Sequence, residues 1–193
     1  MPGPKILVIP GSLRTGSFNV KLAALAVKEL TLNDADVTRL SLADYPMPMY
    51  DGDQEANAGP PANAVKLKHM IAAHHGVFIA TPEYNASVAP LLKNAIDWVS
   101  RVRERNEPPY AAFKGRVFAL GSASPQAAGG LRSLMALRQI LELGCGALVM
   151  PEQVAIQHAE RAFDEQDNIA DVASANALRA QLARLVELAR LMM

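Results

Sequence analysis

Hydrophobic residues in this chain form short uninterrupted runs, separated by longer segments in which they recur every three or four positions. The short runs are Lys5–Pro10, Gly76–Ala80, Arg116–Leu120 and Ala147–Met150. Short apolar runs rich in β-branched residues are typical of strands buried on both faces of a parallel sheet. Ala35–Leu42 instead alternates apolar and polar residues, so we expect it to be an edge strand.

The segments between these runs have the spacing of amphipathic helices, as Leu22, Leu25 and Ala26 illustrate. Strands that alternate with helices through short connections predict an α/β fold with a parallel sheet. We expect a flavodoxin-like three-layer sandwich with a five-stranded parallel sheet in the order 2-1-3-4-5. No linker or repeat divides the chain, so residues 1–193 are expected to form a single domain. The expected helices are Ser17–Leu30, Ala62–His74, Ala89–Arg103, Leu131–Leu143 and Ile169 to the end, and the expected irregular segments are Pro46–Pro61 and Pro151–Asn168.

Composition narrows the functional classes. The 193 residues include 19 Lys and Arg and 19 Asp and Glu, which disfavours a nucleic-acid or anionic-membrane binder. No apolar stretch approaches the ~20 residues of a membrane helix, and the first run is too short for a signal peptide. The single cysteine, Cys145, excludes an intramolecular disulfide and favours the cytoplasm. Its apolar surroundings indicate a buried packing residue.

The loop Gly11–Asn19 connects the first strand to the first helix and has the chemistry of an anion site. Its glycines allow a tight turn, and the helix N-terminus offers free N–H groups and a partial positive charge. Ser12, Ser17 and Asn19 add neutral donors, and Arg14 adds a guanidinium fork suited to phosphate. The loop therefore predicts a bound terminal phosphate.

Three other interpretations apply to this loop. Gly11 and Gly16 have the spacing of a nucleoside-triphosphate loop, but Ser17 and Phe18 follow where that motif requires Lys and Ser or Thr. A dinucleotide loop needs three glycines, and this loop has only two. In the third interpretation Ser17 merely caps a helix and Arg14 is solvated, and the loop alone leaves this open.

A second distinctive loop, Thr81–Asn85, follows the strand Gly76–Ala80 directly. Pro82 stiffens the exit from the sheet, and Tyr84 and Asn85 are groups that a flat, hydrogen-bonding heterocycle would contact. By itself the segment fits a surface turn better. The helix beyond it is apolar on more than one face, which predicts contact with a partner subunit near Trp98 as well as with the sheet.

Together these segments resemble the NADPH-dependent FMN reductase family, which includes quinone, chromate and azo-dye reductases. The resemblance extends from about Lys5 to Met150 and looks closest to the chromate and quinone reductase branch, through Tyr50–Asp51 and Ser100–Arg101. The matching segments are Gly11–Asn19, Thr81–Asn85, Leu92–Trp98, Gly129–Arg132 and Leu137–Leu141.

The resemblance implies a set of FMN-binding residues. The third loop, Gly121–Gly130, is less glycine-rich than is usual in the family, which leaves its flavin contacts open. The implied phosphate ligands are Ser12, Arg14, Ser17, Phe18 and Asn19; the implied contacts of the ribityl chain and ring are Pro82, Glu83, Tyr84 and Asn85; and Ser122 would line the far edge of the ring.

The resemblance also implies an activity. FMN would pass a hydride from NADPH or NADH to a quinone, or to a chromate, azo or nitro acceptor, in a ping-pong cycle. The flavin carries the chemistry, so no catalytic side chain is expected, and the four histidines lack metal-ligand spacing. A homodimer or homotetramer is expected. The alternative is a flavodoxin-type electron carrier, but such carriers are usually strongly acidic and this chain is neutral.

Overall fold

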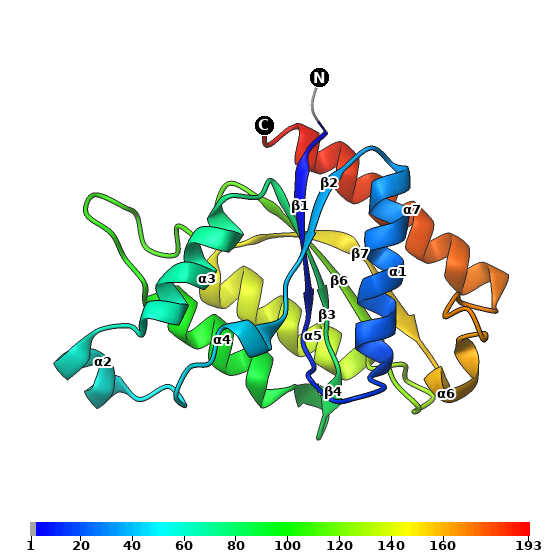
Figure 1. Ribbon diagram of the computed structural model, residues 1–193, viewed down its shortest axis with the longest axis horizontal. Helices are drawn as coiled ribbons and strands as arrows, with labels where there is room; N and C mark the ends of the chain where they lie inside the picture. The colour runs from blue at the N-terminus through cyan, green and yellow to red at the C-terminus, as the bar shows by residue number, and fades with distance from the viewer. Residues whose placement is uncertain (1–2) are drawn as a thin grey trace.

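A computed structural model describes residues 3–193, which form a five-stranded parallel sheet covered by helices (Figure 1). Each strand pairs in parallel with its neighbours, which confirms both the fold class and the order predicted from the sequence. The strands, in spatial order, are β2 (Asp36–Arg39), β1 (Lys5–Pro10), β3 (Gly76–Ala80), β6 (Val117–Ala123) and β7 (Leu148–Ile156).

Helices cover both faces of the sheet and complete the three layers (Figure 1). On one face lie α1 (Phe18–Leu32) and α7 (Val172–Arg190). On the other lie α3 (Ala62–Ala72), α4 (Pro90–Arg101) and α5 (Leu131–Gln139), which ends in a π-helical turn over Ile140–Gly144.

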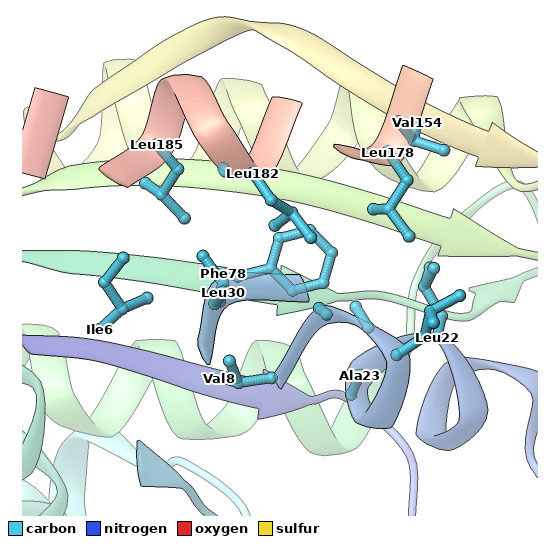
Figure 2. Packing of buried hydrophobic residues seen from close by; sticks show 14 of the residues in the cluster. Ile6, Val8, Leu22, Ala23, Leu30, Phe78, Val154, Leu178, Leu182 and Leu185 are labelled. Carbon is cyan, nitrogen blue, oxygen red and sulfur yellow. The ribbon is translucent and has the colours of Figure 1, made fainter. Parts of the chain in front are cut away.

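Alternate side chains of β1 enter two separate cores. Ile6 and Val8 pack with Phe78 and Leu182 beneath α1 and α7, as Figure 2 shows. Leu7 and Ile9 point to the opposite face, beneath α3 and α4. Successive side chains of a strand alternate between faces, so an uninterrupted apolar run is required wherever both faces are covered. All of these side chains are at most 4% exposed.

The last strand is longer than expected. The prediction that it ends at Met150 and that Pro151 begins an irregular segment is wrong, because β7 continues to Ile156 after a break in its register with β6. Proline is tolerated there because β7 is an edge strand. Gln181 of α7 stabilises the break, since its Nε2 donates to carbonyl oxygens of both strands, at 2.9 and 3.0 Å. A short helix, α6 (Ala159–Ala162), follows within the segment expected to be irregular.

The prediction of a continuous loop over Pro46–Pro61 is also wrong, because the segment contains α2 (Gly52–Ala58). The carboxylate of Asp51 caps this helix by accepting from Asp53 N at 2.8 Å. Glu55 anchors it, since its carboxylate accepts from Tyr50 Oη at 2.8 Å and from Arg101 Nε at 2.9 Å. None of the α2 residues is buried, so hydrophobic periodicity could not reveal the helix.

The carboxyl ends of β1, β3 and β6 meet at one edge of the sheet. A small antiparallel hairpin, β4 (Glu83–Tyr84) and β5 (Ser87–Val88), projects there, at the lower edge of Figure 1. Its two-residue turn, Asn85–Ala86, has positive φ angles of 49° and 62°, the backbone of a tight hairpin turn. Among the helices of residues 3–193, none is long and apolar enough to cross a membrane.

Candidate functional site

A cleft of about 230 Å³ opens where the first helix and the second and third loops meet. The fold brings together residues more than a hundred positions apart, at the edge of the sheet where parallel α/β folds bind ligands. All of the residues predicted for the site except Asn85 and Ser122 line this cleft. The full lining is Ser12, Arg14, Ser17, Phe18, Asn19, Pro82, Glu83, Tyr84, Ala123, Ser124 and Pro125.

One end of the cleft is positively polarised. The guanidinium of Arg14 lies 6.0 Å from the centroid of the Phe18 ring and has no carboxylate partner within salt-bridge distance in residues 3–193. Ser17 is the N-cap of α1, and its side chain makes no capping hydrogen bond within residues 3–193. The first turn of a helix presents N–H groups and a partial positive charge. A free cation beside such a helix end suits a phosphate dianion.

Asn19 lies at this end of the cleft, but its side-chain amide is already engaged. Asn19 Nδ2 donates to Ala123 O at 2.9 Å, and Ala123 N donates to Asn19 Oδ1 at 3.0 Å. The side chain is buried. It therefore joins the first loop to the end of β6, and the group that it offers a ligand is its backbone N–H.

The second loop forms one wall of the cleft. Pro82 and the half-exposed Tyr84 line it, whereas Asn85 forms the turn of the hairpin outside it. The carboxylate of Glu83 does not stand free: it accepts from the backbone N of Arg132 at 3.1 Å and pairs with the Arg132 guanidinium. The loop is thus tied to the start of α5.

The third loop differs from the expectation, because β6 extends to Ala123 and Ser122 belongs to the strand. Ser122 is fully buried and its Oγ donates to Thr81 O at 2.7 Å, so its side chain is engaged within the sheet and does not line the cleft. Ala123, Ser124 and Pro125 line the cleft instead. A strand predicted to end at Ala123 would have placed Ser122 inside the sheet and Ala123–Pro125 at its carboxyl end, beside the cleft.

Trp98 is not a surface residue. It is fully buried, its Nε1 donates to Pro48 O at 2.8 Å, and the Tyr50 ring meets it edge-on at 5.0 Å between centroids. Trp98 itself therefore does not face a partner subunit, because the Pro46–Pro61 segment covers it, and contact through the rest of its helix stays a prediction. Cys145 is buried as predicted, and burial raises the pKa of its thiol to about 11.

Comparison with known proteins identifies the family. The family model for NADPH-dependent FMN reductases matches residues 4–161. The chain belongs to the NADPH-dependent FMN reductase family. It is 38% identical over 183 residues to the NAD(P)H-dependent FMN reductase of Pseudomonas aeruginosa, an alignment that covers 94% of this chain and 92% of the relative.

Two further proteins to which the chain is similar are also oxidoreductases by name. The quinone reductase of Escherichia coli K12 is 38% identical over 138 residues, covering 71% of this chain and 69% of the relative. Among solved structures, the flavoenzyme NAD(P)H:(acceptor) oxidoreductase FerB from Paracoccus denitrificans superposes with a TM-score of 0.78. It is 30% identical, and the match covers 97% of both chains.

The cleft fits the cofactor of this reductase family. FMN has a dianionic phosphate at one end and a planar ring system at the other. The unpaired Arg14 and the start of α1 supply a cation and N–H donors at one end of the cleft. Pro82 and Tyr84 on one side, and the triplet Ala123–Pro125 on the other, supply the walls that a flat ring needs. These groups would bind and orient FMN, and FMN itself would supply the redox chemistry.

Proposed function

We propose that this chain is an NAD(P)H:quinone oxidoreductase that works through FMN bound in the cleft. The observation that carries the proposal is the guanidinium of Arg14 at the N-terminus of α1, inside a cleft of about 230 Å³, where no carboxylate of residues 3–193 pairs with it. Relatives named quinone reductase, and a 2-hydroxy-1,4-benzoquinone reductase of Burkholderia sp. that is 34% identical over 172 residues, support the choice of acceptor.

The protein's part is binding and orientation. FMN, when bound, accepts a hydride from NADPH or NADH and returns the electrons to the acceptor. Arg14 and the N–H groups of Phe18 and Asn19 would hold its phosphate, together with Ser12 and Ser17. Because these groups are fixed by the helix and by the Asn19–Ala123 bridge, the phosphate would determine how deeply the ring enters the cleft.

The ring would lie between the second and third loops. Pro82 and Glu83 contribute backbone to one wall, and Tyr84, with 48% of its surface exposed, is free to cover the outer part of the ring. Asn85 would approach the ring only through the hairpin turn. No side chain is assigned a proton-transfer or nucleophilic role, since hydride transfer requires the two rings to be stacked and correctly oriented.

Steady-state oxidation of NADPH and of NADH by 1,4-benzoquinone tests the proposal. The FMN-loaded protein should turn over far faster than an equal concentration of free FMN, and initial rates should give the parallel double-reciprocal lines of a ping-pong cycle. FMN binding without turnover above free FMN would instead identify a flavodoxin-type electron carrier. Absence of flavin absorption bands after incubation with FMN and gel filtration would reject both.

We further propose that residues 1–193 act as one domain, in the cytoplasm, as a homodimer or homotetramer. With Trp98 buried, the surface that favours association is on α5, where Leu131 and Met135 lie one turn apart and are 41% and 62% exposed. The hairpin that carries Tyr84 packs beside them. Light scattering after gel filtration should give two or four times the mass of 20.7 kDa, and Met135→Glu should lower it.

A further inference from the structure

Helix α5 begins without a capping side chain of its own. Its N-cap is Gly130, at φ +86°, and its first turn contains no acidic residue. A side chain could not be added at this position, because a Cβ on Gly130 would lie 1.8 Å from Ser122 Oγ. Leu131 N donates to Ala128 O at 3.0 Å. The other N–H groups and the partial positive charge of this helix end are open to groups from outside the helix.

Glu83 supplies that missing group from the neighbouring loop. Its Oε2 accepts a hydrogen bond from the backbone N of Arg132 in the first turn of α5, at 3.1 Å, and its Oε1 pairs with the Arg132 guanidinium. The side chain of Glu83 is only 5% exposed, whereas that of Arg132 is 55% exposed. A nearly buried carboxylate is retained where both hydrogen bonds and an opposite charge compensate it.

The contact joins one wall of the cleft, the second loop, to the start of α5, the helix that follows the third loop in the chain. At the inner end of the walls, Thr81 N donates to Gly121 O at 2.8 Å and Ser122 Oγ donates to Thr81 O at 2.7 Å. These bonds belong to the sheet edge and lie before the hairpin begins. Beyond them, the hairpin packs against α5, and Glu83 and Arg132 add a hydrogen bond and an ion pair between the second loop and this helix.

We propose that Glu83 is a positioning residue, whose carboxylate caps α5 from the second loop and so holds that wall of the cleft in place against α5. This inference rests on the proposed function for the identity of the ligand, FMN. It assigns the Glu83 side chain to the protein scaffold, although the residue lines the cleft. It also gives Arg132 a defined task, which is to neutralise a carboxylate that would otherwise repel the FMN phosphate and the reduced ring.

Two measurements on one set of variants test the proposal. The first is the hydrogen-exchange rate of the Arg132 amide in the protein without flavin, which does not depend on the proposed function. The second is the dissociation constant for FMN and for riboflavin, from quenching of flavin fluorescence. The variants are Glu83→Ala, Glu83→Gln, Arg132→Met and the double variant Glu83→Ala/Arg132→Met. Glu187→Gln on α7, an exposed acid paired with Arg184, is the matched control.

In Glu83→Ala the Arg132 amide should exchange faster, and FMN and riboflavin should both bind about fivefold to tenfold more weakly, because cleft geometry affects the ring they share. Glu83→Gln keeps an acceptor for the Arg132 N–H and should recover most of both losses. The double variant should bind FMN no more weakly than Glu83→Ala, and Glu187→Gln should match the native protein.

Unchanged exchange of the Arg132 amide in Glu83→Ala would overturn the proposal. A second pattern of results would also overturn it. In that pattern Glu83→Gln and Glu83→Ala lose the same flavin affinity, and the losses of Glu83→Ala and Arg132→Met add up in the double variant. Such a result means direct contact between the carboxylate and the ligand. If the native protein binds no flavin, the proposed function fails, and the exchange measurement still decides whether Glu83 caps α5.

Discussion

Asn19 and Ala123, 104 positions apart, are joined by a reciprocal pair of hydrogen bonds between a side-chain amide and a backbone peptide, at 2.9 and 3.0 Å. The pair ties the first turn of α1 to the end of β6, with both partners buried. An amide side chain can imitate a strand's backbone because it offers one donor and one acceptor in the same plane. This bridge holds the Arg14 end of the cleft against the third loop.

Replacing Asn19 by Ala should therefore destabilise the protein, by about 2–4 kcal/mol, because two hydrogen bonds are lost and a buried peptide N–H and C=O remain unsatisfied. Urea unfolding followed by circular dichroism measures this free energy. Asn63→Ala is the matched control, since its Nδ2 donates to Pro46 O in an exposed setting. A loss of FMN affinity with unchanged stability would show that Asn19 is a ligand and not a bridge.

Arg14→Ala should weaken FMN binding about 10- to 100-fold, as expected for loss of a charge-assisted hydrogen bond to phosphate worth about 1.5–3 kcal/mol. Riboflavin, which has no phosphate, should bind as it does to the native protein. Fluorescence titration with both flavins measures the difference, and Arg190→Ala, near the C-terminal end of α7, controls for the loss of a positive charge. Equal weakening of both ligands would mean that Arg14 does not contact the phosphate.

The thiol of Cys145 should be unreactive in the folded protein. It is 3% exposed and its pKa is raised to about 11, mainly by burial. At pH 8 only about one thiol in a thousand is then ionised, and the thiolate is the reactive form. Ellman's reagent should label it slowly in buffer and promptly in guanidinium chloride. Rapid, complete labelling of the native protein would show that this junction between α5 and β7 opens readily.

A buried lysine holds the segment that follows α4. Lys68 of α3 is 2% exposed, and its Nζ lies 3.0 Å from a Glu104 oxygen and 2.6 Å from a Glu107 oxygen. Burial alone would lower the pKa of Lys68, but hydrogen bonds to Glu107 and Glu104 outweigh it and raise that pKa. The same bonds to Lys68 lower the pKa of both glutamates.

These directions define the pH range in which the cluster stabilises the fold. The glutamates contribute above their unfolded pKa of about 4.3, and this contribution is lost as the pH falls through their lower folded values. The lysine contributes below about 10.4 and loses its effect as the pH rises through its higher folded value. Hydrogen exchange of residues 103–109, corrected for intrinsic rates, should therefore accelerate on acidification.

The substitution Lys68→Met tests whether the cluster causes this change. The methionine side chain fills the buried volume without a charge, so residues 103–109 should exchange faster than in the native protein at pH 7 and show a smaller acid transition, which the remaining contact between His69 and Glu104 would cause. Native protection and a native pH profile in the Lys68→Met variant would mean that other contacts hold this segment.

Regular structure was predictable wherever burial left a periodic signal. The strands β1 and β3 and the helices α1 and α3 follow from their apolar patterns, because each is covered by the other layers. The signal failed for α2, which buries no side chain and depends on Asp51 for its N-terminal cap and on Arg101 for the contact that holds Glu55. It failed again at Pro151, where an edge position and the amide of Gln181 let the strand continue.

For the cleft, too, the sequence predicted some features and missed others. Residue types in the two loops, Arg14 and Tyr84 among them, together with the family resemblance, predict a phosphate and a flat ring at one edge of the sheet, and the structure brings both loops to one cleft there. The sequence could not assign tasks within the site. Ser122 and Asn19 have the donors of a ligand-binding residue, but their partners are backbone groups on strands and loops far away in the chain.

The sequence by itself therefore determined the α/β architecture, the strand order, the family and the edge of the sheet that holds the cleft. These follow from periodicity and from the order of local motifs, both of which are local properties of a chain. The tertiary structure decided which polar side chains face the cleft and which fasten it, including the contact between Glu83 and α5. That choice depends on which unsatisfied backbone groups lie within hydrogen-bonding distance, and packing alone brings them there.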